Sequence, residues 1–118
     1  MIKPVFDILT LTQGENNISA ALAINADSQI FDGHFPGHPV VPGACMLQLV
    51  KDLLSETLRV SPKMLKADNI KFLGLVQPGV EGLNLNVNYQ LTDSQIKLAA
   101  TLSSADTTYM KLQGSLAI

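Results

Sequence analysis

Both histidines of the chain fall in one proline-rich stretch, GHFPGHPVVPGA, which runs from Gly33 to Ala44. Its three prolines each fix φ, so the stretch predicts a loop held in one shape. His34 stands at the head of this loop and can act as a general base near neutral pH. If a helix begins at Gly43, its first backbone N–H groups lack intrahelical acceptors and can bind a developing oxyanion. A base beside such a helix start is what abstraction of a proton next to a thioester carbonyl requires.

Other interpretations of these side chains stay open. A histidine in a short protein is often structural or simply exposed, and this interpretation stays open for His34. His34 and His38 are also candidate metal ligands, but no acidic residue or cysteine has a suitable local spacing, which disfavours a zinc site. Cys45 falls at the expected helix start, where a thiol pKa can drop, yet it lies on the apolar side and is interpreted as a packing residue. Gln48 and Asp52 lie one helical turn apart, and a solvated face is their simplest interpretation.

The segment after the loop predicts one helix from Gly43 to about Val60. Its polar residues are spaced three, one, three, one and three positions apart, which places them on a single helical stripe. Because the rest of the circumference is apolar, we expect most of the helix to be buried. The Ser-Pro pair at 61 and 62 is expected to end it, since proline disfavours α geometry in the residue before it. The stripe consists of Gln48, Lys51, Asp52, Ser55, Glu56 and Arg59.

Alternating apolar and polar residues predict strands on both sides of this helix. Leu83 to Leu91 alternates without a break, and the turn residues TDS and SSAD separate it from two further alternating segments. Before the helix, Ile18 to Ile24 alternates in the same way. The predicted strands after the helix are Ile70–Gly79, Leu83–Leu91, Ile96–Leu102 and Met110–Ile118. An antiparallel sheet with one helix on a face would bury both, which indicates the α+β class.

Composition bounds the remaining possibilities. A chain of 118 residues with 47% hydrophobic content suits a single domain over residues 1–118. Only 15% of residues are charged, so we expect part of the surface to be covered, most simply by a second copy. A formal charge of −2 without a basic run gives no support to nucleic-acid binding, and the apolar runs are too short for a membrane span. The N-terminus lacks a secretory signal and Cys45 is the single cysteine, so we expect a cytoplasmic protein.

The stretch GHFPGHPVVPGACMLQ resembles the signature of the 3-hydroxyacyl-(acyl carrier protein) dehydratases of fatty-acid synthesis, H-F-P-x-x-P-V-x-P-G followed by a helix. KFLGLVQPGVEGLNLNVNY is similar to the family's strand with a Pro-Gly turn and the strand after it. The resemblance implies the hot-dog fold, an antiparallel sheet wrapped around one long central helix. It also implies a homodimer with its acyl tunnels and two active sites at the subunit interface, and no metal or organic cofactor.

The resemblance also assigns roles to residues of the loop and helix start. It implies that His34 is the catalytic base and that the amide of Gly43 holds the thioester oxygen. Phe35, Pro42 and Ala44 are the expected substrate-binding residues. The expected reaction converts 3-hydroxyacyl thioesters on acyl carrier protein into trans-2-enoyl thioesters, in fatty-acid or related polyene or polyketide synthesis. The alternatives are a weakly active or non-catalytic acyl-binding subunit and a hot-dog thioesterase, which the loop signature disfavours.

One position departs from the family pattern. The family places an acid fourteen positions after the catalytic histidine to protonate the leaving hydroxyl, and counting from His34 gives Gln48. An amide cannot supply that proton. One turn later, where many members carry Gln, this chain has Asp52. A turn is ~5.4 Å, beyond the ~3 Å reach of proton transfer, so a water or Gln48 itself would have to relay between Asp52 and the hydroxyl.

Basic residues indicate how a carrier protein could dock. Five of the eight fall within one fifth of the chain, although the net charge is negative. Carrier proteins are acidic, and a basic patch would steer their encounter in a salt-dependent way. The alternative is an ordinary solvated helix end. The predicted docking residues are Lys51, Arg59, Lys63, Lys66 and Lys71.

Overall fold

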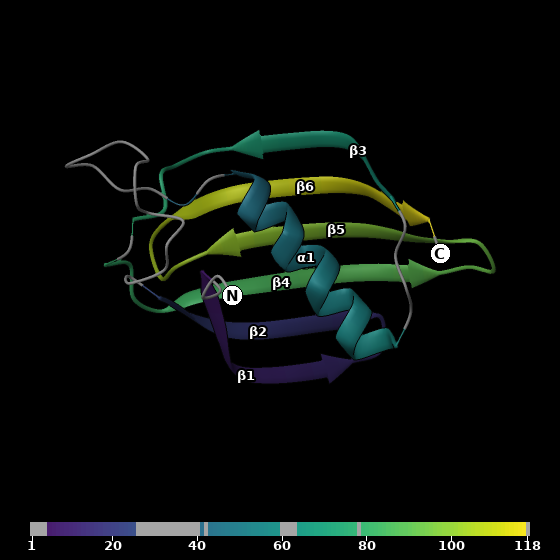
Figure 1. Cartoon of the computed structure of the whole chain (residues 1–118), viewed down its shortest axis with the longest axis horizontal. Helices are drawn as coiled ribbons and strands as arrows, with labels where there is room; N and C mark the ends of the chain where they lie inside the picture. Colours follow the sequence, from purple (N-terminus) through teal and green to yellow (C-terminus); the bar gives the residue numbers. More distant parts are fainter. Residues whose placement is uncertain (1–4, 26–40, 42, 60–63, 78, 118) are drawn as a thin grey trace.

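The computed structural model describes residues 5–25, 41, 43–59, 64–77 and 79–117. Six strands and one helix lie within these ranges (Figure 1). In chain order they are β1 (Phe6–Gly14), β2 (Asn17–Ile24), α1 (Gly43–Leu58), β3 (Met64–Phe72), β4 (Leu83–Leu91), β5 (Gln95–Ser103) and β6 (Thr108–Ala117).

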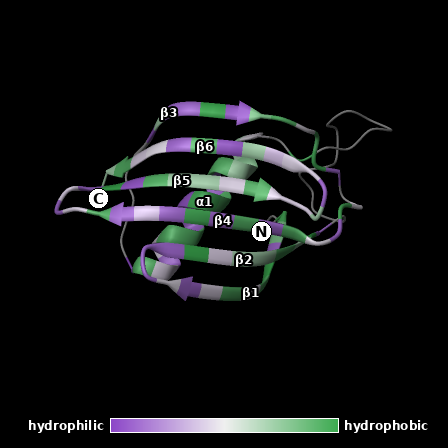
Figure 2. Ribbon diagram, turned by 180° about the vertical axis from the view of Figure 1, so that it is seen from behind, coloured by the Kyte–Doolittle hydropathy of each residue, from purple (hydrophilic) through white to green (hydrophobic). Residues whose placement is uncertain are grey.

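The strands form one antiparallel sheet in the order β1-β2-β4-β5-β6-β3. Helix α1 crosses one face of this sheet diagonally, and the opposite face carries no described element (Figures 1 and 2). The predicted α+β architecture, with an antiparallel sheet around one long helix, is therefore confirmed.

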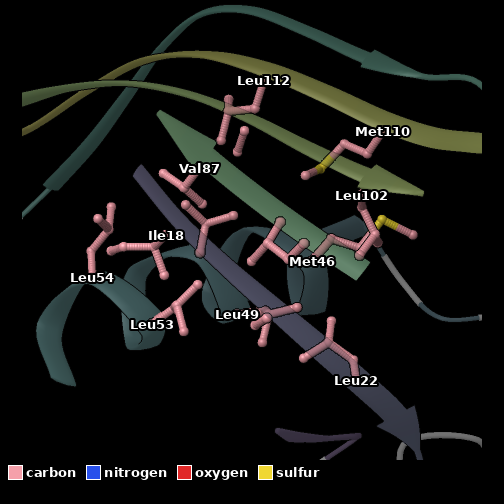
Figure 3. Close-up of a cluster of buried hydrophobic side chains, with 14 of the residues drawn as sticks. Ile18, Leu22, Met46, Leu49, Leu53, Leu54, Val87, Leu102, Met110 and Leu112 are labelled. Atoms are coloured by element: carbon pink, nitrogen blue, oxygen red, sulfur yellow. The ribbon is translucent and has the colours of Figure 1, made fainter. Parts of the chain in front are cut away.

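The core lies between α1 and the sheet face beneath it. In β4, buried apolar residues alternate with exposed asparagines, as the sequence pattern predicts. The buried side of α1 packs onto side chains such as Ile18 and Val87 (Figure 3). Burying one such aliphatic side chain stabilises the fold by roughly 1.5–3 kcal/mol before entropy is counted. The helix contributes Met46, Leu49, Val50, Leu53 and Leu54 to this core.

The helix begins where the sequence predicts and ends two residues before the predicted end. Its first residue is Gly43 and its last is Leu58. Arg59 has φ of 54°, in the left-handed region, a conformation that commonly ends helices. The expected stop at Ser61-Pro62 lies outside the described residues, and α1 has already ended before it.

Strand β3 differs from its prediction. The sequence pattern predicts Ile70–Gly79, whereas β3 runs from Met64 to Phe72. A bulge at Asp68 interrupts its pairing with β6, because Ala67 pairs with Gly114 and Asn69 already pairs with Gln113. An added Cβ at Gly114 would collide with the backbone carbonyl of Lys66, so this glycine lets β3 approach β6 closely.

Strand β1 has no counterpart among the predicted strands. It pairs with β2 at the edge of the sheet and is mostly exposed. A register shift between Ile8 and Thr10 places Leu9 in a bulge. The remaining strands confirm their predictions to within two residues at each end, with β6 described as far as Ala117.

Candidate functional site

The first turn of α1 packs against the end of β3. A Cβ added to Gly43 would lie 2.9 Å from Cζ of Phe72, so a side chain there requires the ring to move. Just before the helix, Val41 N–H donates to the carbonyl oxygen of Val76 at 2.7 Å. This bond ties the chain entering α1 to the segment that follows β3. The helix start is thereby fixed beside an aromatic ring.

The helix start is also electrostatically suited to an anion. The first turn of α1 contains no acidic residue, so no side chain of its own offsets the positive end of the dipole. The first N–H groups of a helix have no intrahelical acceptor. The amides of Gly43, Ala44 and Cys45 are therefore candidate donors to a developing oxyanion. Ala44 is exposed, and Gly43 and Cys45 are half-buried.

Several sequence-predicted site residues lie outside the described residues. They are His34, Phe35, His38, Pro42 and Lys63. Their roles stay predictions.

A small pocket runs along one side of α1. Its volume is about 190 Å³, and its walls come from the first two described residues, Val5 and Phe6, together with four residues of the helix. The helix residues are Cys45, Gln48, Leu49 and Asp52. Nothing in the sequence pattern points to Val5 and Phe6 as pocket walls, because their contact with α1 depends on how the N-terminal segment is placed.

Gln48 and Asp52 are joined by a direct hydrogen bond in this pocket. The side-chain amide Nε2 of Gln48 donates to Oδ1 of Asp52 at 2.8 Å. Both side chains are exposed, so both can be reached from solvent. The structure therefore brings together the two residues at which the sequence departs from the resembling family, and it makes them a bonded pair rather than two independent surface groups.

Cys45 lines the same pocket and is half-buried. Burial raises the pKa of its thiol above the ordinary value. Cys45 is accordingly a packing residue with a weakly acidic thiol.

The four predicted docking residues that the structure describes do not form one surface. Lys51 and Arg59 belong to the helix layer. In the β3–β6 register, Lys66 pairs with Ser115 and Lys71 pairs with Lys111. These positions alternate with the buried residues of β6, so Lys66 and Lys71 lie on the sheet face away from α1.

Two further lysines share this outer face. Lys111 is directly opposite Lys71, and Lys97 lies beside Ser115 in the β5–β6 register. The sequence separation of Lys97 and Lys111 from the others hides this cluster, which only the strand order reveals. We call Lys66, Lys71, Lys97 and Lys111 the outer-face lysines.

The described residues lack two features that would change the interpretation of the site. No three His, Cys, Asp or Glu side chains in the described part of the chain are grouped so that they could hold a metal ion. Within the same ranges, no helix has the length and apolar character needed to cross a membrane.

Comparison with known proteins points to one enzyme class. A family model described as "ApeI-like: ApeI dehydratase" matches residues 10–112. The 3-hydroxyacyl-[acyl-carrier-protein] dehydratase FabZ of Oenococcus oeni is 29% identical over 106 residues, which cover 84% of this chain and 75% of the relative.

Solved structures confirm the expected hot-dog fold. A chain of the dehydratase heterocomplex ApeI:P from Xenorhabdus doucetiae superposes with a TM-score of 0.76 at 21% identity, covering 98% of this chain and 99% of that one. A thioesterase from Staphylococcus aureus superposes with a TM-score of 0.64 at 10% identity, covering 95% and 91%. Since dehydratase and thioesterase chains both share the fold, the fold alone does not select the reaction, whereas the family match does.

Proposed function

The chain belongs to the ApeI-like dehydratase family and is a dehydratase, and on that premise we propose that it converts 3-hydroxyacyl thioesters on acyl carrier protein into trans-2-enoyl thioesters. The observation that carries the proposal is the family match over residues 10–112, which includes the HFPGHPVVPG loop and the helix start after it. We propose that the activity belongs to one domain over residues 1–118 in the cytoplasm, and the single free thiol is compatible with that compartment.

We propose His34 as the base and the amide of Gly43 as the donor to the thioester oxygen. His34 removes the proton from C2 of the substrate, and negative charge develops on the thioester oxygen. The hydroxyl on C3 takes up a proton, the C3–O bond breaks so that water leaves, and the C2=C3 double bond forms. Beside Gly43, the ring of Phe72 supplies an apolar wall, and hydrogen bonds to a developing charge are stronger next to apolar groups than in water.

We assign substrate contact to Phe35, Pro42 and Ala44. Ala44 supports this assignment because it is exposed in the first turn of α1, beside the proposed oxyanion donor. Phe35 and Pro42 are assigned from their places in the loop motif alone.

The proposed assembly is a homodimer formed at the β3 edge of the sheet. β3 is a terminal strand in the sheet order, so one side of its backbone has no strand partner among the described residues. Phe72, Leu73 and Leu75, at and after its end, are 52%, 54% and 71% exposed. A second copy covering them would remove this apolar surface from water. It would also place the interface beside Gly43, because Phe72 contacts that residue.

A second candidate is an acyl-binding subunit that works with an active partner. The chain's structural likeness to a member of a dehydratase heterocomplex favours it, as does the amide of Gln48 at the position where the family has an acid. The same edge of β3 would then hold a different dehydratase chain.

For the carrier protein, we propose docking on the outer-face lysines. Like charges directly opposite each other on neighbouring strands are unfavourable, and Lys71 faces Lys111 in this way. An acidic partner would relieve that repulsion. Lys71 also precedes Phe72, so the outer-face lysines reach the end of β3 that adjoins the helix start.

The assay that tests the function incubates the purified protein with a 3-hydroxyacyl thioester and identifies the product by mass. An enoyl thioester supports the proposal. A free acid would identify a thioesterase, and binding without turnover would identify the acyl-binding subunit.

A further inference from the structure

The pocket on α1 combines an apolar floor with one polar pair. Cys45, Gln48, Leu49 and Asp52 are spaced as i, i+3, i+4 and i+7, so they line one face of the helix. Val5 and Phe6 close the opposite side. Apolar walls with a few placed polar groups are typical of sites that orient a small ligand.

Asp52 fixes the orientation of the Gln48 amide. A primary amide has two N–H donors and one oxygen acceptor, whereas an ionised carboxylate can only accept. The amide nitrogen of Gln48 must therefore face Asp52, as the 2.8 Å bond shows. Hydrogen bonds to a charged acceptor are stronger than neutral ones. Because this bond fixes the amide, the second N–H and the carbonyl oxygen of Gln48 point in fixed directions and can bind a ligand.

We infer that Gln48 binds the 3-hydroxyl group of the substrate and that Asp52 is a positioning residue acting through Gln48. This inference rests on the proposed dehydratase function. A hydroxyl both donates and accepts hydrogen bonds, so it complements the remaining N–H and oxygen of the amide. In this assignment Asp52 acts on the substrate only through Gln48, whose amide its Oδ1 accepts from and orients.

The proton balance follows from this assignment. A neutral amide does not release a proton, so the leaving hydroxyl takes the proton that the base has just removed. The C2–H bond breaks and its proton moves to the imidazole of His34. The C–H electron pair forms the C2=C3 bond, and the C3–O bond breaks. The departing oxygen receives the proton from the imidazolium and leaves as water, which restores the neutral base.

A double-mutant cycle separates this role from that of an acid. Gln48→Ala should lower kcat/KM about 10²-fold, the scale of losing a specific polar contact at a reacting group. Asp52→Ala should lower it about 10-fold, and Asp52→Asn less, because the asparagine oxygen still accepts the amide N–H. In the Gln48→Ala background, Asp52→Ala should have no further effect, since a positioning residue acts only through its target. Glu56→Gln is the matched control, an exposed acid one turn beyond the pocket.

Two outcomes would overturn the inference. If Asp52→Asn is as damaging as Asp52→Ala while Gln48→Ala is mild, Asp52 is the acid. If the two effects add fully in the double variant, Asp52 does not work through Gln48.

A binding measurement distinguishes failure of the inference from failure of the proposed function. The wild-type protein should bind a 3-hydroxyacyl thioester about 10-fold more tightly than the acyl thioester lacking the hydroxyl, and Gln48→Ala should abolish that preference. This preference can be measured even in a protein that shows no turnover. Absence of turnover with the preference retained would contradict the proposed function but not the inference. Equal affinity of wild-type protein for the two thioesters would overturn the inference.

Discussion

The two faces of the sheet are built from different chemistry. The face beneath α1 is a close-packed apolar layer in which side chains such as Leu53 and Leu85 are fully buried. The outer face carries polar side chains, including Asn17, whose amide nitrogen donates to Asn86 at 2.9 Å and Asn88 at 2.8 Å. The helix-side face holds the fold together and positions the candidate site. The outer face is mostly polar, and it is the face on which we propose that the carrier protein docks.

The largest expected effect comes from truncating a buried side chain on the helix-side face. Leu53→Ala should lower the free energy of unfolding by about 2–5 kcal/mol, because Leu53 is buried and its loss leaves a cavity. Asn86→Ala is the matched outer-face variant and should cost less than about 1 kcal/mol, since its hydrogen bonds are exposed. Urea denaturation measures both. Similar losses of unfolding free energy in the two variants would contradict the claim that the helix-side face stabilises the fold more than the outer face.

A bulky residue at the helix start should damage catalysis more than stability. Gly43→Val pushes against Phe72 and should lower kcat about 10²-fold, because small displacements of a reacting group's partner have effects of this size. Steady-state kinetics checks this, and Gly14→Val is the control because open space surrounds Gly14. Adding Phe72→Ala to Gly43→Val should recover part of the activity. A fully active Gly43→Val protein would show that the helix start does not contact the substrate.

Charge reversal on the outer face should affect only carrier-bound substrate. Lys71→Glu with Lys111→Glu should raise KM for the carrier-bound thioester about 10-fold and leave a small thioester analogue unchanged. Kinetics with both substrates at low and high salt measures this, and the effect should shrink as salt rises. If reversal of Lys51 and Arg59 raises KM instead, the carrier docks on the helix side.

The smallest expected effect concerns the thiol in the pocket. Burial raises the pKa of Cys45, so less thiolate is present near pH 7 and alkylation by iodoacetamide should be several-fold slower than for free cysteine. The rate should rise with pH, and a bound acyl thioester analogue should slow it further because Cys45 lines the pocket. Mass spectrometry of the labelled protein follows the reaction. Labelling at the rate of free cysteine would contradict the packing found around this residue.

The sequence predicts strands well where their alternation is unbroken, and the predicted start of β6 at Met110 falls just after the irregular pairing at Tyr109. In β4 the inward residues recur at every second position, so the pattern identifies the strand directly. In β3 the inward positions step from Ala67 to Ile70, because Asp68 is the extra residue of a bulge. In β1 the same break occurs at Leu9. Both are edge strands, where bulges are common, and alternation alone does not locate these two strands.

In the candidate site, local spacing also predicts some features and leaves others unpredicted. The start of α1 at Gly43 and the proximity of Gln48 and Asp52 follow from local spacing, since residues four apart share a helix face. The proposed docking surface does not follow from local spacing. Lys66 is close to Arg59 in sequence, yet the sheet separates them, while Lys111 becomes a neighbour of Lys71 only through strand pairing.

The most direct test of the account is the reaction of a 3-hydroxyacyl thioester with the purified wild-type protein and with His34→Ala, followed by mass and by the absorbance of the conjugated enoyl product. Wild-type protein should form the trans-2-enoyl thioester. The His34→Ala protein, with an unchanged melting temperature, should lose roughly 10²-fold to 10⁴-fold of that rate, the range for removal of a general base. Undiminished dehydration by His34→Ala, or release of a free acid by the wild-type protein, would contradict the account.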